Sequence, residues 1–81
     1  MANDAATFQD ITVIFKASAS ADDKQKTMDS IKKSGGTIKG ESELINGFFA
    51  KVPKSEGLSN SLTGAHPAID SVELDQVITT Q

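Results

Sequence analysis

The order of its hydrophobic patterns constrains this chain more than any other feature. Two segments with helical spacing of apolar residues lie between segments in which apolar and polar residues alternate. The expected elements, in chain order, are a strand at 10–16, a helix at 21–34, strands at 37–44 and 48–52, a helix from about 55 to 65, and a strand from 69 onwards. Right-handed crossovers then place both helices on one face of a single sheet.

Local signals support these boundaries. Ser20 and Asp23 form the pattern of a capping box, and Gly35 follows the helix as a stop signal. Asn46–Gly47 is typical of a hairpin turn, whereas Gly40 indicates a bulge or an edge position in its strand. The core stripe expected on the first helix is thin and consists of Ala21, Met28 and Ile31. The predicted fold class is therefore α+β, a ferredoxin-like βαββαβ arrangement whose four-stranded antiparallel sheet carries both helices on one face.

Length and charge exclude several classes of protein. With 81 residues, the chain has room for one core, and without Cys it has neither a disulfide nor a thiolate ligand. The net charge is −3 and all 8 basic residues are Lys, which argues against a nucleic-acid partner. No apolar run is long enough for a membrane span, and the first residues do not resemble a signal peptide. We therefore expect a cytoplasmic monomer without a membrane partner.

The chain offers little to catalysis. His66 is its only histidine and lies beside Pro67 at the expected end of a helix, where a surface or capping role is the common one. No nucleophile motif, phosphate loop or calcium-loop spacing is present. An acylphosphatase-like enzyme on this fold would need an anchoring Arg, which the sequence lacks. We expect no enzyme, no catalytic residue, no metal and no cofactor.

The last ten residues form an extended tail. Val72 and Leu74 alternate with Glu73 and Asp75, which is typical of a half-buried strand, and β-branched residues follow to Thr80. A frayed terminus is the ordinary interpretation of such an end. The alternative is a peptide-like arm that pairs with the strand edge of another protein.

The sheet face without helices is the second candidate surface. If Val13 and Phe48 point toward the helices, Ile14 and Phe49 point to the open face. An apolar pair on such a face is a candidate docking surface, although isolated exposed apolar residues are also common.

Four segments together resemble the propeptides of subtilisins. They are Ile11–Lys16, Lys33–Ile38, Asn46–Pro53 and Val72–Asp75 with six further residues behind it. The sequence resembles in particular the stand-alone branch of this family, the fungal proteinase A/proteinase B inhibitor type, over residues 11–81. The fold known for this family is the ferredoxin-like one.

The resemblance implies inhibition of subtilisin-like serine proteases in a product-like manner. The open sheet face, with Ile14 and Phe49, would dock on the protease. Glu73 and Asp75 match family carboxylates that approach the N-termini of protease helices, where backbone N–H groups accept anions. The substrate groove would hold the protease-binding tail, which consists of Ile78, Thr79, Thr80 and Gln81.

Within this interpretation the chain divides into a flexible lead-in at 1–9, an inhibitor domain at 10–77 and an inhibitory tail at 78–81. Because the sequence ends at Gln81, no scissile bond is expected beyond it. Two other roles stay open on the same fold. The chain could be a propeptide that acts as an intramolecular chaperone of a subtilisin-like protease, or a ferredoxin-like ligand-binding module.

Overall fold

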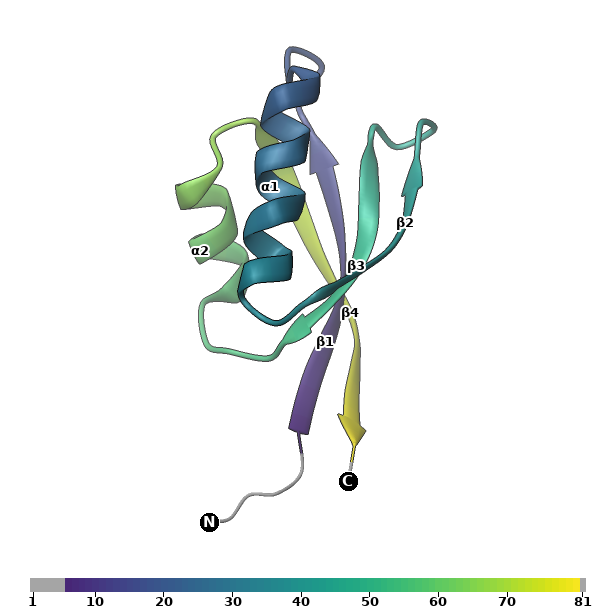
Figure 1. Cartoon of the computed structure of the whole chain (residues 1–81), viewed down its shortest axis with the longest axis vertical. Coiled ribbons are helices and arrows are strands. Elements are labelled where there is room, and N and C mark those ends of the chain that lie inside the picture. The colour runs from purple at the N-terminus through teal and green to yellow at the C-terminus, as the bar shows by residue number, and fades with distance from the viewer. Residues whose placement is uncertain (1–5, 81) are drawn as a thin grey trace.

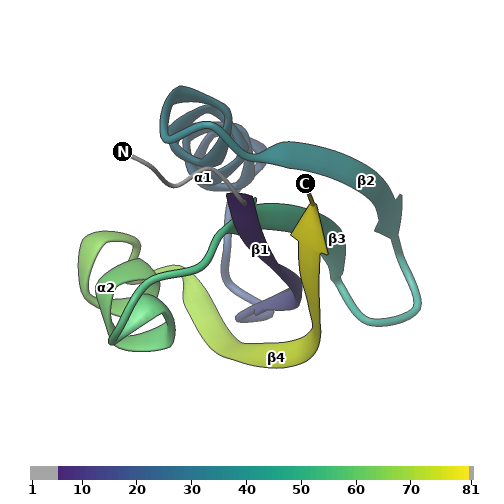
Figure 2. The same ribbon diagram turned by 90° about the horizontal axis from the view of Figure 1, so that it is seen from below.

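A computed structural model describes residues 6–80 as a four-stranded antiparallel sheet with two helices (Figure 1). The elements are β1 (Ala6–Phe15), α1 (Ala21–Lys33), β2 (Thr37–Ser42), β3 (Gly47–Pro53), α2 (Leu58–Ala65) and β4 (Ile69–Thr80). The strand order is β2-β3-β1-β4, so β2 and β4 form the two edges. Both helices lie on the same side of the sheet (Figure 2). The predicted ferredoxin-like fold is confirmed.

The core forms where the alternating residues of the two central strands meet the helices. β1 and β3 each direct every second side chain to the helix side, and the register pairs Val13 with Phe48 and Ile11 with Ala50. The ring centroids of Phe15 and Phe48 are 5.7 Å apart. The buried apolar side chains are Ile11, Val13, Phe15, Ile31, Phe48, Ala50, Val52 and Ile69.

The capping box predicted for α1 is present. The Ser20 Oγ accepts a hydrogen bond from the Asp23 N–H at 3.0 Å, and the Asp23 carboxylate accepts one from the Ser20 N–H at 3.1 Å. This backbone hydrogen bond, together with the Ser20 hydroxyl, lowers the pKa of Asp23 below its usual value. At the other end Gly35 takes a φ of 96°, which ends the helix as the sequence predicts.

Gly47 is required where the hairpin meets β1. A Cβ placed there would lie 1.8 Å from the Val13 carbonyl oxygen, so no side chain fits without a backbone shift. Asn46 precedes it with a φ of 53° and accepts the left-handed conformation that the turn demands.

Several predicted boundaries are wrong. β1 begins at Ala6, so residues 6–9 are part of the sheet and not of a flexible lead-in. β2 ends at Ser42, and Leu44 lies in the turn with 98% of its surface exposed. α2 begins at Leu58 and not at about residue 55; the left-handed Gly57 precedes it, and no side chain caps it. On α1 the buried residues are Thr27 and Ile31, whereas Ala21 is exposed.

Replacing Ile31 by Ala should lower the free energy of unfolding by about 2–5 kcal/mol, because Ile31 is 1% exposed and its removal leaves a cavity under α1. Leu44→Ala is the matched control and should change it by less than about 0.5 kcal/mol. Urea denaturation followed by circular dichroism measures both values. Equal effects of the two substitutions would contradict the position of the core.

Candidate functional site

The helix-free face of the sheet carries the residues that the sequence assigned to docking. Phe49 is 41% exposed there, and Ile14 is half-buried on the same face. Across the strands, Phe49 pairs with Thr12 on β1, and Ile14 pairs with Gly47 and Ser71. The predicted orientation of Ile14 and Phe49 agrees with this register, although their docking role stays a prediction.

The two predicted carboxylates lie on the outer strand of this face. Glu73 is exposed and pairs with Thr12 in the β1–β4 ladder. Asp75 is also exposed, but its Oδ2 accepts a hydrogen bond of 2.7 Å from the Thr12 hydroxyl. Thr12 is buried on the open face, at 7% exposure, and its hydroxyl is hydrogen-bonded. Asp75 is held in place by a neighbour that the sequence alone did not identify.

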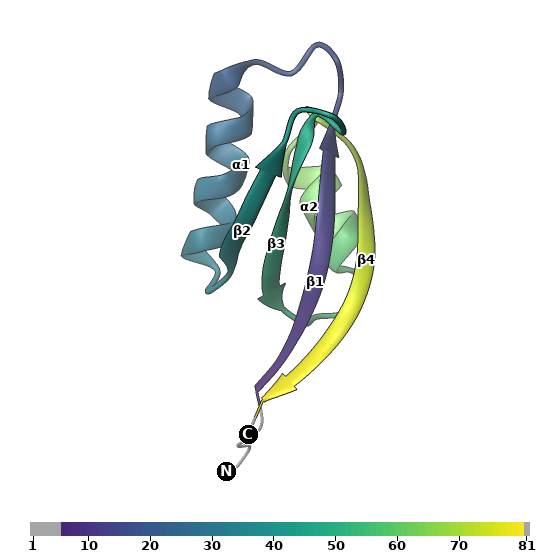
Figure 3. The same cartoon turned by 90° about the vertical axis from the view of Figure 1, so that its right-hand side faces the viewer.

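The predicted tail is not a free arm in this structure. β4 continues to Thr80 and pairs with the first residues of β1, so that Phe8 lies opposite Ile78 and Thr7 opposite Thr79. The two strands extend beyond the rest of the sheet as a ribbon (Figure 3). Ile78 is half-buried and Thr79 is exposed. Gln81 lies outside the described residues.

Only one edge of the tail is occupied. β4 is an edge strand, so its outer backbone groups have no neighbouring strand among residues 6–80. An unpaired edge of this kind is a template for a further strand. The arrangement combines an extended edge strand, β4, with an open sheet face on which Phe49 is exposed. The carboxylates of Glu73 and Asp75 lie on β4 itself.

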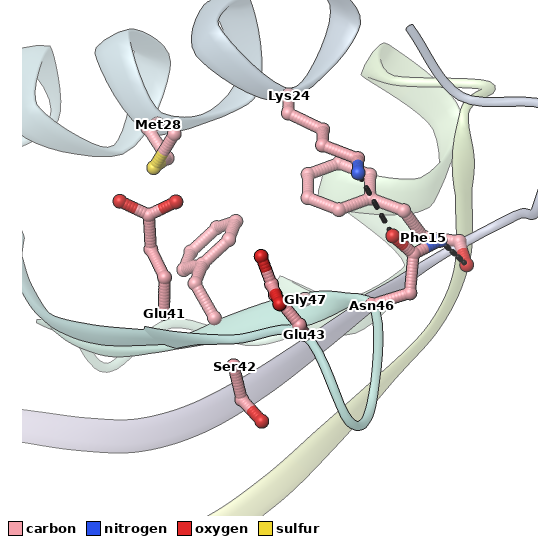
Figure 4. A pocket seen from close by; sticks show the side chains of 9 residues that line it. Phe15, Lys24, Met28, Glu41, Ser42, Glu43, Asn46 and Gly47 are labelled. Atoms are coloured by element: carbon pink, nitrogen blue, oxygen red, sulfur yellow. Dashed lines mark hydrogen bonds between the residues drawn. The ribbon is translucent and has the colours of Figure 1, made fainter. Parts of the chain in front are cut away.

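A separate hollow of about 470 Å³ lies on the helix side, between α1 and the β2–β3 hairpin (Figure 4). Lys24 points into it, donates to the Asn46 Oδ1 at 2.8 Å and lies 5.9 Å from the centre of the Phe15 ring. Its cation is thus satisfied by the hairpin itself. The hollow is on the other face of the sheet from Phe49.

Within residues 6–80, no three His, Asp or Glu side chains gather as metal ligands. His66 forms the C-cap of α2, and its Nε2 is buried without a hydrogen-bond partner in the described structure. In this part of the chain, neither helix is long and apolar enough to cross a membrane.

No family model, curated protein or solved structure is significantly similar to this chain.

Replacing Thr12 by Val should remove the hydrogen bond to Asp75 while keeping the side-chain shape. We expect a loss of about 1 kcal/mol in the free energy of unfolding, because the hydrogen bond from the Thr12 hydroxyl to the Asp75 carboxylate is lost. Thr12→Ser keeps the hydroxyl and serves as the control. Thr12→Val with the stability of the parent would show that this contact does not hold Asp75.

Proposed function

We propose that this protein inhibits subtilisin-like serine proteases. The open face of the sheet docks on the protease, and residues 78–81 occupy the substrate groove in a product-like manner. The observation that supports this most is the position of β4, an edge strand that runs beyond the core beside the open face. A protease groove binds extended backbone, and an extended edge strand offers it without rearrangement.

The ribbon bears on the affinity of such a complex. Ordering a free tail of four residues would cost roughly 4–8 kcal/mol at about 1–2 kcal/mol per residue. Pairing of Thr7 and Phe8 with Thr79 and Ile78 already holds this part of the tail extended before any partner binds. Much of the ordering cost is then met during folding, which favours tight binding.

The carboxylates of Glu73 and Asp75 bind the protease in this proposal. Glu73 and Asp75 face the partner along β4 and accept hydrogen bonds from backbone N–H groups at the N-termini of protease helices. Asp75 arrives with one oxygen engaged by Thr12, so its orientation is set before binding. Each such contact contributes about 0.5–2 kcal/mol, by analogy with helix capping.

Titration of a subtilisin with this protein, followed by hydrolysis of a chromogenic peptide over hours, tests the proposal. Stoichiometric and lasting loss of activity is expected. Loss followed by recovery would indicate the temporary inhibition of a propeptide. No loss at micromolar inhibitor would overturn the proposed function.

Removal of residues 78–81 should weaken inhibition by at least about 100-fold, since the contacts of the tail are lost together. The fold should persist, because none of the buried apolar core residues lies in this segment. Inhibition constants and thermal melting by circular dichroism give the two readouts. Unchanged inhibition by a folded truncated protein would exclude the tail mechanism.

Ile78→Ala should weaken inhibition by about 2 kcal/mol, or roughly 30-fold, if the Ile78 side chain fills an apolar pocket of the protease. Val77→Ala is the matched control, since Val77 is exposed and pairs with Gln9, whose side chain lies on the helix side of β1. We expect less than a threefold change for Val77→Ala, about the size of an ordinary surface substitution. Equal losses for both variants would contradict the assignment of Ile78.

A further inference from the structure

Two β-bulges face each other across the open side of the sheet. On β2 the register shifts between Ile38 and Gly40, which leaves Lys39 as the extra residue. On β4 it shifts opposite Asp10, where Asp75 and Gln76 stand against a single residue of β1. Bulges redirect side chains and often border functional sites. Between them lies a hollow of about 360 Å³, whose lining includes Asp10, Lys39, Phe49 and Asp75.

Asp10 is only half satisfied within this hollow. Its Oδ2 accepts one contact of 3.2 Å from the Lys39 amino group. Its Oδ1 is enclosed and has no hydrogen-bond partner in the described structure. The Asp10 side chain is 15% exposed, whereas that of Lys39 is 49% exposed and can move aside. A buried carboxylate oxygen without a hydrogen-bond donor is energetically unfavourable. A second N–H group beside Oδ1 would therefore stabilise the Asp10 carboxylate.

The other charged side chains near the hollow do not donate a hydrogen bond to the Asp10 Oδ1. Asp75 adds a second carboxylate to the hollow, and Thr12 engages only its Oδ2. Lys51 is opposite Asp10 in the β1–β3 ladder, but its amino group lies 5.1 Å from the centre of the Phe8 ring and forms no ion pair with Asp10. Of these two carboxylates, only Asp10 is paired with a cation, Lys39.

A guanidinium group fits these requirements better than an ammonium group. Its planar fork matches both oxygens of a carboxylate with two parallel hydrogen bonds, whereas Lys39 contacts only Oδ2 of Asp10. Its flat face can stack on an aromatic ring, and Phe49 is exposed at the border of the hollow. The sequence contains no Arg, so such a group has to come from another molecule.

We propose that this hollow binds the guanidinium group of an arginine side chain presented by the protein that docks on the open face. The arginine displaces Lys39, donates to both oxygens of Asp10 and lies over Phe49. That this protein is a protease rests on the proposed function, whereas the preference of the hollow for guanidinium does not.

The hollow is tested first without any protease. Ethylguanidinium is titrated into the ¹⁵N-labelled full chain and the amide chemical shifts are followed, with ethylammonium as the matched probe. Saturable shifts at Asp10, Phe49 and Gln76, stronger for ethylguanidinium and lost in Asp10→Asn, are expected. Shifts that are equal for the two cations, that occur elsewhere or that persist in Asp10→Asn overturn the proposal.

A second experiment tests whether an arginine of the partner binds Asp10. It measures inhibition of a subtilisin-like protease by variants that should change the inhibition constant in opposite directions. Asp10→Asn should weaken inhibition about tenfold or more, as expected for loss of a charge-assisted contact. Lys39→Gln removes the competing cation and should tighten it, and Asp22→Asn on the exposed surface of α1 should leave it unchanged. Weakening by both Asp10→Asn and Lys39→Gln would indicate a structural ion pair and overturn the exchange. If the parent does not inhibit, the proposed function fails, and the ethylguanidinium titration still decides the site.

Discussion

The architecture depends on the alternation of side chains along β1. This strand pairs with β3 on one edge and β4 on the other, so it fixes the register of both. Its odd-numbered residues from Ile11 to Phe15 fill the core beneath the helices, and its even-numbered residues lie on the open face. A shift of one residue would exchange these faces, and the core would be lost together with the candidate site.

The alternation also explains which parts of the fold the sequence could predict. Period-2 patterns and turn residues depend on near neighbours, so the six elements, the capping box and the hairpin turn before β3 were predictable. The start of β1 was not, because residues 6–9 become a strand through pairing with segments far away in the sequence, the end of β4 and the end of β3. The burial of Thr27 was missed because its hydroxyl donates to the Asp23 carbonyl oxygen, which makes a polar residue compatible with the core.

The candidate site, like the fold, was predictable only where local sequence patterns determine it. Alternation was enough to place Ile14 and Phe49 on the open face, and the resemblance drew attention to Glu73 and Asp75. The contact between Thr12 and Asp75 and the pair of Lys39 with Asp10 join residues far apart in the sequence. Both depend on where the edge strands bulge, and a bulge leaves only a weak local signal such as Gly40.

The ribbon of β1 and β4 places the two ends of the described chain side by side, since Ala6 pairs with Thr80. Any fusion partner or affinity tag joined ahead of β1 would emerge next to the end of β4 and crowd the approach of another molecule to that strand. Leu44, almost fully exposed in the hairpin turn at the opposite end of the molecule, offers a remote point for fluorophores or surface immobilisation (Figure 1). The attachment point chosen for purification or biosensing would thus determine whether the end of β4 is sterically accessible.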